Sequence, residues 1–349
     1  MQTIEIKNQQ EWDRLLGQCE RKTFLQTWQW GEFQEYLGYE IKRMVFFNNE
    51  KFLGLTLCII NKSRFERYVY CPRGPLLSKD NSEIYAQALG ALKEFWEKKH
   101  ISTLKVDPAF LRDSKISKLP QKCGFKHTVN FIQSENNWMI DLVGENEEDL
   151  LRWCKEHGMS KNYPTYIRKA RHSGIEIEFS KEQKDWDLFH TYLKYSGQRK
   201  EFEVKSKRYH IGMWECLGKD SDILRLGIAK RNGKILAMIV ISSYGDEVSA
   251  LYSAQTGVDS RLRATMLLRW ECMLLGQREG FKRFNSWGVL PEKKYTPKNP
   301  GFGYSQYKRG FGGYLEEIER TYEYVFNKAL HPLQKLYDFY LKLRYYRFR

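Results

Sequence analysis

The segment Leu224–Tyr244, LRLGIAKRNGKILAMIVISSY, contains two apolar, β-type runs joined by Asn232–Gly233. This pair of residues favours a tight hairpin turn, so the segment predicts two antiparallel strands. Another strand is predicted at Glu247–Tyr252, a long helix at Leu262–Arg278 and a returning strand at Arg283–Trp287. A hairpin, a third strand, a helix and a returning strand together predict a mixed sheet with flanking helices.

The first half of the chain contains the same order of elements, about 180 residues earlier. Ile41–Asn48 and Phe52–Ile60 predict a hairpin, and a third strand is predicted at Tyr68–Cys71. A helix follows at Ser82–Lys99 and a returning strand at Ser102–Val106. Two series in the same order favour a duplicated α/β unit over a chance similarity.

Both series end in a K-x-G-F sequence, KCGF from Lys122 and KRGF from Lys308. We therefore predict two tandem α/β domains, residues 1–145 and 146–349, the second with a basic C-terminal helix. The layout resembles the N-acetyltransferase-like fold, whose acetyltransferases hold coenzyme A with a glycine-bearing loop at a helix start. The matching segments here, SRLRATM from Ser260 and LLSKDNSEIY from Leu76, contain no glycine. The sequence thus predicts an acyl donor other than coenzyme A.

Composition limits the classes of partner. The chain has 349 residues, 42% of them hydrophobic, and a formal charge of +15 that attracts polyanions such as nucleic acid, an anionic membrane or a phosphorylated substrate. Its seven cysteines lack CxxC or Cys/His spacing, which favours reduced thiols in a cytosol. The scattered histidines predict no metal site, and neither a signal peptide nor an apolar membrane span is recognisable.

The stretch Pro300–Tyr314, PGFGYSQYKRGFGGY, combines five glycines with several aromatic residues. Such a backbone bends sharply or lets another molecule approach closely. We expect Lys308 to extend from a strand end into a cleft, where catalytic and binding groups are often found. The alternative is a surface turn with a solvated lysine.

Seven segments, taken together and in order, resemble the Fem family over nearly the whole chain. They are FLQTWQWGEF (Phe24–Phe33), YCPRGPLL (Tyr70–Leu77), LKVDP (Leu104–Pro108), NYPTYIRKARHSGIEIE (from Asn162), LYSAQ (Leu251–Gln255), NSWGV (Asn285–Val289) and YKRGFGG (Tyr307–Gly313). Members of this family are aminoacyl-tRNA-dependent ligases that build the interpeptide bridge of bacterial peptidoglycan. Their fold is similar to a duplicated N-acetyltransferase fold. The stretch 179–199 has no room for a coiled-coil pair, so this chain resembles the compact, armless type.

The resemblance implies roles for individual residues. Lys308 matches the position of a cation implicated in catalysis, and Asp107 is the expected acceptor or orienter of the incoming amine. The expected contacts to the precursor come from Arg199, Tyr209 and Tyr252. The alternative for Arg199 is a cation at a helix end, and for Tyr252 it is ordinary packing. Apart from the resemblance, Arg73 in PRGP is expected either to hold phosphate or to occupy a rigid corner. Gln34 stands where some members have a lysine that holds the nucleotide diphosphate, which puts that contact in doubt.

The reaction implied is attack by a stem-peptide amine on the ester of an aminoacyl-tRNA, with Lys308 stabilising the oxyanion and no cofactor or metal. The acceptor would be a UDP-linked or lipid-linked precursor, and we expect a cytoplasmic monomer with peripheral membrane contact. Two alternatives remain: an acyltransferase of this fold acting on another amine or glycan, and a non-catalytic basic RNA-binding protein. The basic, aromatic tail from His331 predicts a membrane surface, a tRNA surface or a helix with its aromatic face in the core.

Overall fold

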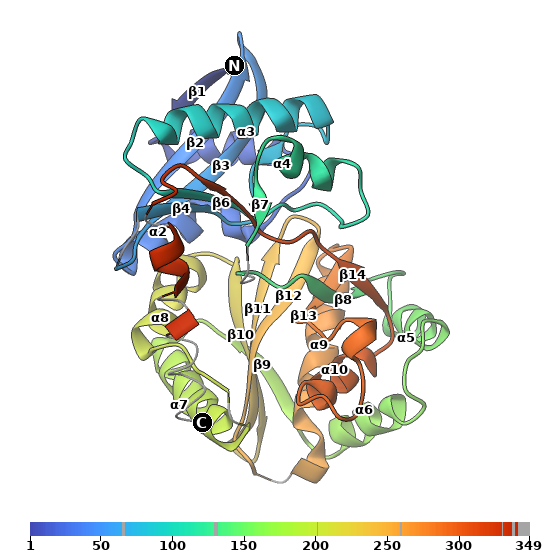
Figure 1. Ribbon diagram of the computed structural model, residues 1–349. Coiled ribbons are helices and arrows are strands. Elements are labelled where there is room, and N and C mark those ends of the chain that lie inside the picture. The colour runs from blue at the N-terminus through green and yellow to red at the C-terminus, as the bar shows by residue number, and fades with distance from the viewer. Residues whose placement is uncertain are drawn as a thin grey trace. The chain divides into compact units, whose positions relative to one another are not determined.

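The computed structural model describes residues 1–64, 67–128, 132–200, 202–258, 260–329, 331–336 and 339–340. The chain forms two compact units, one from residues 1–135 with 318–349 and the other from 136–317. Each unit contains a mixed sheet with helices on its faces (Figure 1). The predicted α/β fold class is therefore confirmed.

The first unit is built on an eight-stranded sheet in the order β1-β2-β3-β4-β6-β15-β7, with β5 paired to β3. Its strands are β1 (Gln2–Glu5), β2 (Glu40–Asn48), β3 (Lys51–Lys62), β4 (Arg67–Cys71), β5 (Leu76–Leu77), β6 (Thr103–Val106), β7 (Lys126–His127) and β15 (Tyr322–Val325). Its helices are α1 (Gln9–Gly17), α2 (Trp28–Tyr36), α3 (Ser82–Glu97) and α4 (Leu119–Lys122). The core lies between the sheet and α3, whose apolar residues recur on one face.

The second unit is built on a seven-stranded sheet in the order β14-β8-β13-β12-β11-β10-β9. Its strands are β8 (Asn136–Asp141), β9 (Glu176–Ser180), β10 (Leu224–Arg231), β11 (Lys234–Tyr244), β12 (Glu247–Gln255), β13 (Arg283–Gly288) and β14 (Tyr314–Glu317). Its helices are α5 (Glu147–Glu156), α6 (Tyr163–His172), α7 (Gln183–Lys200), α8 (Lys207–Met213), α9 (Ala264–Arg278) and α10 (Phe302–Arg309). Asn232 and Gly233 both have positive φ in the β10–β11 turn, as the predicted hairpin requires.

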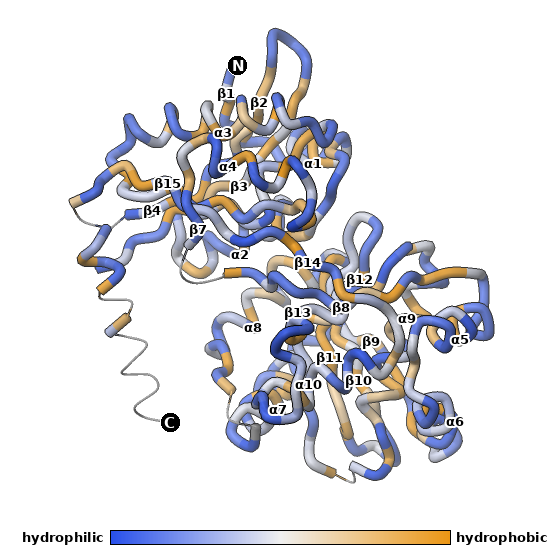
Figure 2. Tube along the Cα trace, turned by 45° about the vertical axis from the view of Figure 1, so that its right-hand side comes forward, coloured by the Kyte–Doolittle hydropathy of each residue, from blue (hydrophilic) through white to orange (hydrophobic). Residues whose placement is uncertain are grey.

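Helix α9 is the central helix of the second unit. It packs on β10, β11 and β12 and is buried on nearly all sides, because α6 covers it from outside. Helix α7 packs on β12, and Figure 1 shows it on the side of the sheet opposite α9. In Figure 2 the outer helices α5 and α6 are largely hydrophilic, as expected for helices that bury one face.

The two sheets repeat one topology, which agrees with the duplication predicted from the sequence. In each, an antiparallel hairpin leads to a strand that pairs in parallel with the strand after the long helix, β4 with β6 and β12 with β13. The next position in the first sheet is taken by β15 and in the second by β8. Each unit therefore receives that strand from the chain segment that follows the series of the other unit.

This strand exchange explains why the domain boundaries differ from the predicted 1–145 and 146–349. Residues 136–141 form β8 and belong to the second sheet, whereas 322–325 form β15 and return to the first. Lengths of the described helices give no sign of an inserted coiled-coil arm, α7 with 18 residues being the longest of them. Nor does any described helix have the length and apolar character needed to cross a bilayer.

Candidate functional site

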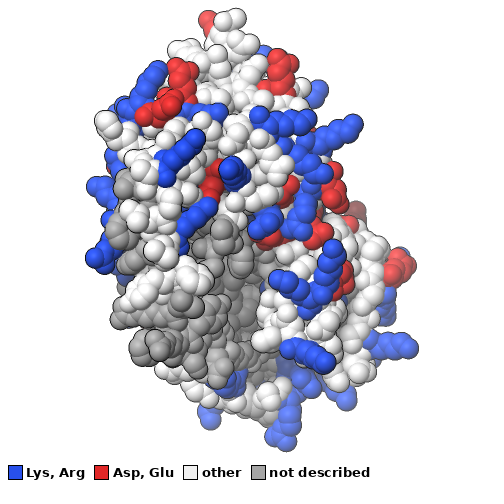
Figure 3. All heavy atoms as spheres, in the orientation of Figure 1, with Lys and Arg blue, Asp and Glu red and all other residues white. Residues whose placement is uncertain are grey.

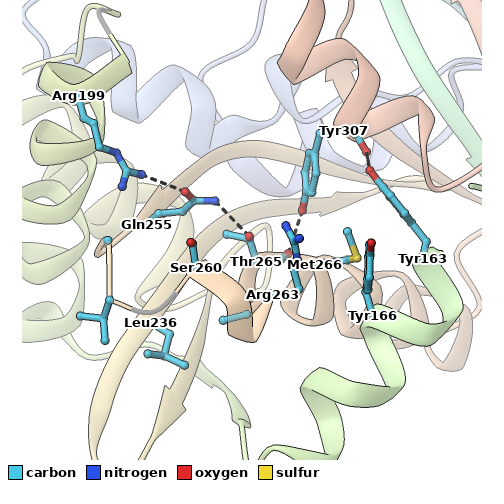
Figure 4. Close-up of a pocket in the computed structure, with 13 residues that line it drawn as sticks. Tyr163, Tyr166, Arg199, Leu236, Gln255, Ser260, Arg263, Thr265, Met266 and Tyr307 are labelled. Atoms are coloured by element: carbon cyan, nitrogen blue, oxygen red, sulfur yellow. Dashed lines mark hydrogen bonds between the residues drawn. The ribbon is translucent and has the colours of Figure 1, made fainter.

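A cavity of about 340 Å³ opens in the second unit at the start of α9 (Figure 4). It lies at the carboxyl end of β12, where its walls include Gln255 and Tyr307. The parallel strands β12 and β13 pair only over Glu247–Ser249 and Arg283–Asn285, and beyond that β12 stays with β11 and β13 with β8. Ligand sites commonly form where parallel strands diverge at their carboxyl ends.

Two arginines and two tyrosines give the cavity its chemistry. Tyr163 and Tyr166 are three residues apart on α6 and therefore face the same side. Arg263 precedes α9 with φ of 55°, a left-handed conformation uncommon for arginine, and its guanidinium lies 5.0 Å from the Tyr166 ring centroid. Arg199 enters from α7. Among the residues that the structure describes, neither arginine forms an ion pair with a carboxylate.

A chain of hydrogen bonds crosses the cavity wall (Figure 4). Arg199 Nη2 donates to Gln255 Oε1 at 3.1 Å, and Gln255 Nε2 donates to Thr265 Oγ1 at 3.1 Å. Gln255 is held in turn by Ser196, whose hydroxyl exchanges hydrogen bonds of 3.0 Å with its backbone. The position of Arg199 is thus set by β12 and by the first turn of α9.

A second hollow, of about 470 Å³, lies on the other side of Tyr163 and Tyr307. These two residues line both spaces and are joined by a hydrogen bond from the Tyr163 hydroxyl to the Tyr307 carbonyl at 3.2 Å. The Tyr307 hydroxyl donates to the Thr265 carbonyl at 3.0 Å. The two tyrosines therefore form a wall that is held in place by the first turn of α9 and the last turn of α10.

Lys308 lies in the last turn of α10, directly after Tyr307. The expectation of a strand end was wrong, because the segment from Phe302 continues as a helix until Gly310. Its ammonium group donates to the Gly288 carbonyl at 2.7 Å. Burial, reinforced by the charge of Arg269, lowers the pKa of Lys308 to about 7.

A bulge in β13 provides the acceptor for Lys308. The pairing of β13 with β8 shifts between Asn285 and Gly288, and Trp287 has φ of 62°. The Trp287 N–H donates to Asn285 Oδ1 at 2.7 Å, which fixes this turn within the strand. Bulges of this kind redirect groups next to functional sites. Here the bulge turns the Gly288 carbonyl toward α10.

The glycines after Lys308 serve close packing. A Cβ on Gly310 would overlap the Tyr163 ring, and Gly312 has φ of 84° beside the Cys154 carbonyl. Between them, Phe311 is fully buried with its ring centroid 5.1 Å from Tyr163 and 5.5 Å from Tyr307. Packing of the KRGFGG segment against Tyr163 and Tyr307 therefore fixes the backbone of Lys308 beside these two tyrosines.

Three of the predicted site residues lie in the first unit. Asp107 is 1% exposed, and its carboxylate lies 3.6 Å from Arg73 Nη1 and accepts hydrogen bonds from Thr321 (3.1 Å) and Tyr70 (3.4 Å). Burial raises the pKa of Asp107, although Arg73 and these hydrogen bonds oppose the shift. Gln34 is also buried. These are contacts of a structural ion pair, and the proposed roles of Asp107, Arg73 and Gln34 in binding or catalysis stay predictions.

The remaining predicted residues lie in the second unit. Tyr209 and Tyr252 lie together, with their hydroxyls 3.4 Å apart, and the buried His210 packs edge-on against both rings. Burial and the neighbouring His190 lower the pKa of His210 to about 4, so it is neutral behind the two tyrosines. Arg199 instead faces the cavity.

Sequence reasoning missed Tyr163, Tyr166, Arg263 and Arg269 as individual site residues. Tyr163 and Tyr166 lie within the quoted NYPTYIRK segment, and their spacing of three was the available signal. Arg263 lies in SRLRATM, which was considered only for its lack of glycine. Arg269 gave no signal, because one arginine in a helix pattern usually indicates a solvated face.

The described part of the basic tail differs from the expected packing. Residues 331–336 and 339–340 are helical, and Lys335 and His331 pair with Glu323. Phe339 and Tyr340 are mostly exposed, so the interpretation of the tail as a helix with its aromatic face in the core was wrong for these positions. The cations at 342, 344, 347 and 349, predicted to contact tRNA, lie outside the described residues.

Comparison with known proteins finds one matching family and several similar solved structures. The model of the FemAB family matches residues 8–232. The crystal structure of FemX is similar with a TM-score of 0.84 at 16% identity, covering 95% of this chain and 99% of that one. A conserved protein of unknown function from Bacteroides thetaiotaomicron has a TM-score of 0.57 at 14% identity, covering 92% and 98%. L-PGS from Bacillus licheniformis has 0.54 at 11%, covering 94% and 95%. None of the curated proteins compared with the chain matches it in sequence.

Proposed function

Because this chain belongs to the FemAB family, we propose that it transfers an amino acid from aminoacyl-tRNA to the stem-peptide amine of a peptidoglycan precursor, forming an interpeptide bridge. The observation that carries this proposal is the cavity at the start of α9. There, Arg199 and Arg263 have no carboxylate partner among the described residues, and both stand beside tyrosine rings.

The 3′ end of an RNA fits this lining. Its phosphates require cations, and arginine binds phosphate oxygens with two parallel hydrogen bonds. Its terminal bases are unpaired and present flat faces, which stack on aromatic rings such as Tyr163 and Tyr166. The positive end of the α9 dipole adds to the attraction for a phosphate.

The same loop argues against coenzyme A as the donor. A pyrophosphate cradle needs several backbone N–H groups at a glycine-rich turn. Here Arg263 occupies the left-handed position that glycine would normally take, so a long side chain enters the cavity. The Arg263 side chain therefore suits a ligand whose phosphates are bound by side chains, in contrast to a pyrophosphate bound by backbone N–H groups.

The chemistry assigned to Lys308 is stabilisation of negative charge. The ester of an aminoacyl-tRNA is already activated, so the enzyme must hold amine and ester together and stabilise the tetrahedral oxyanion. Lys308 is fixed by Gly288 next to the tyrosine wall of the cavity, and as an ammonium it supplies charge and hydrogen bonds. No cofactor is needed for this step.

For the acceptor, Tyr209 and Tyr252 form a polar pair in the same unit as Lys308. We propose that they contact the precursor, which is linked either to UDP or to a lipid. The surplus of cations suits both anionic substrates, and Figure 3 shows Lys and Arg side chains spread widely over the face drawn.

The test is transfer by the purified chain. A mixture of charged tRNAs is incubated with a UDP-linked precursor and, separately, a lipid-linked one, and the products are identified by mass spectrometry. We expect a precursor heavier by one or more aminoacyl residues with one carrier. Acylation from another donor, but not from charged tRNA, would favour a different acyltransferase. Binding of tRNA without any product in either mixture would favour the RNA-binding alternative.

A further inference from the structure

Arg269 is a buried arginine without a counter-charge. It lies in the middle of α9 and is 4% exposed. Its Nη1 donates to the Ser286 hydroxyl at 3.3 Å, and its guanidinium carbon lies 5.4 Å from the Tyr307 ring centroid and 5.9 Å from that of Phe284. Its Nε has no hydrogen-bond partner, and within the described part of the chain no carboxylate pairs with it.

Such an arrangement is costly for the fold. Removing an ion from water without a partner of opposite charge costs several kcal/mol of solvation free energy. An apolar residue of similar length at this position would avoid that loss, since the adjacent residues Leu268 and Trp270 of α9 are apolar. A buried, uncompensated charge that acts on a candidate catalytic residue therefore indicates an electrostatic role.

Arg269 and Lys308 are held by the same end of one strand. Arg269 binds the Ser286 hydroxyl, and Lys308 binds the Gly288 carbonyl, on the two sides of the bulge at Trp287. Both acceptors are neutral. One cation is permanently charged, because a guanidinium does not lose its proton in proteins, whereas the other can titrate.

The groups around Lys308 leave Arg269 as the charge that acts on it. Charged or titratable side chains on the elements packed there include Tyr304, Tyr307 and Arg309 of α10, Arg269 and Cys272 of α9, Tyr163 of α6, and Glu292 and Tyr295 of the preceding segment. Glu271 of α9 is paired with Arg171 and Arg283 of β13 with Glu316, and Lys293 is exposed. Glu292 is engaged by Arg309. Burial first and Arg269 second lower the pKa of Lys308.

We propose that Arg269 is a positioning residue of the reaction. Its permanent charge, held by a hydrogen bond to the strand that also binds Lys308, allows Lys308 to carry the proton that the attacking amine loses. This rests on the proposed function. Lys308 then has two consecutive tasks, first as a neutral base and then as the ammonium that faces the oxyanion.

The proton balance of the step is complete. The amine nitrogen forms a bond to the ester carbonyl carbon, the carbonyl π electrons move to oxygen, and the proton leaving nitrogen passes to Lys308 Nζ. The ammonium so formed stabilises the oxyanion. On collapse the C–O bond to the ribose breaks, and Lys308 returns its proton to the ribose oxygen. The products are the amide and the free tRNA.

The first test is the pH profile of transfer for Arg269→Gln, measured between about pH 5.5 and 8.5 at saturating acceptor. Since the neutral form of Lys308 is the base, the rate of the parent protein should rise through a pKa of about 7. Loss of the nearby charge raises the pKa of Lys308. The rising limb of the pH–rate profile should therefore move by about one pH unit to higher pH. At pH 7 the variant should be roughly fivefold slower and should recover as the pH rises.

Two variants serve as controls. Arg269→Lys retains the charge and should keep the limb near that of the parent, even if packing lowers the rate at every pH. Arg278→Gln removes an equal charge from the exposed last turn of the same helix and should leave the limb unmoved. A limb that shifts equally in Arg278→Gln would show a general charge effect and overturn the proposal.

The second test needs no turnover. The rate at which a small amine-acylating reagent modifies Lys308, read by peptide mass spectrometry across the same pH range, reports its titration directly. We expect the midpoint near pH 7 in the parent and a higher one in Arg269→Gln. A midpoint that does not move overturns the inference even if transfer from aminoacyl-tRNA is active.

A midpoint that moves in a protein without transfer would instead count against the proposed function. A rate limb that falls with pH would show that Lys308 acts only as an ammonium and would also overturn the proton-carrier role.

Discussion

At the scale of single residues, Lys308 is the strongest candidate for catalysis in the second unit. Lys308→Met removes the ammonium while keeping most of the side-chain volume, so we expect turnover to fall by about 10²–10³ with little change in stability. Single-turnover transfer and a thermal melt measure the two effects. Lys293→Met, an exposed lysine before α10, is the matched control and should behave like the parent. Unchanged turnover in Lys308→Met would remove the assignment.

Asp107 is expected to respond differently. Its carboxylate is buried beside Arg73, and Asp107→Asn would leave that arginine buried without its charged partner. Breaking a buried ion pair typically costs about 3–5 kcal/mol, so the free energy of unfolding should fall by this order. Urea unfolding measures the change. A variant with parental stability but a much lower kcat would instead support the catalytic role predicted from the sequence.

Gly310 allows the close packing against Tyr163 to be tested with a single methyl group. A methyl group at this position would collide with the Tyr163 ring, so Gly310→Ala should destabilise the protein by about 1–3 kcal/mol and disturb the tyrosine wall. Gly303→Ala, about two turns earlier in α10, meets nothing within 4 Å and should be neutral or stabilising. Equal melting temperatures for the two variants would contradict the packing argument.

At the scale of elements, the start of α9 is the expected phosphate site. Each phosphate that a protein neutralises releases bound counterions, so the affinity for tRNA should fall log-linearly with salt. Arg199→Gln and Arg263→Gln should each weaken tRNA binding and make that slope shallower by about one unit. Arg278→Gln, at the exposed other end of α9, should leave the slope unchanged. Retention of affinity and slope in both cavity variants would move the donor site elsewhere.

The elements also show what the sequence could and could not predict. The hairpin of β10 and β11 was predictable because Asn232–Gly233 is a strong local turn signal. Strands β8, β14 and β15 were not predicted, since they are only four to six residues long and their pairing depends on partners far along the chain. The helix that carries Lys308 was missed because its glycines weaken every local helix signal.

For the site, local sequence was informative only where spacing or a motif was present. It indicated Lys308, Arg199 and the segment holding Tyr163. It could not show that Asp107 is enclosed by Arg73 and Thr321, because Thr321 is brought to it by β15 from the far end of the chain. Arg269 lies against Ser286 of β13 and Tyr307 of α10, and no single helix pattern reveals such distant partners.

At the scale of the whole molecule, the two units should differ in their ability to fold as isolated fragments. The second unit is one continuous segment, so a fragment of residues 136–317 should fold and unfold cooperatively. A fragment of residues 1–135 lacks β15, which lies between β6 and β7 and carries the fully buried Tyr322. It should show weak secondary structure and no cooperative transition by circular dichroism. Cooperative unfolding of the shorter fragment would show that the exchanged strand is dispensable.

The exchange of β15 also sets an order of events on the ribosome. Strand β6 ends at Val106, but its partner β15 begins only at Tyr322. At typical rates of synthesis, roughly 10–40 s separate the two. The segment made first is therefore completed last, after the whole second unit has been synthesised. Throughout that interval the edges of β6 and β7 are unpaired, and such edges pair readily with other chains. The nascent N-terminal segment is thus the part of this protein that most needs protection by chaperones during translation.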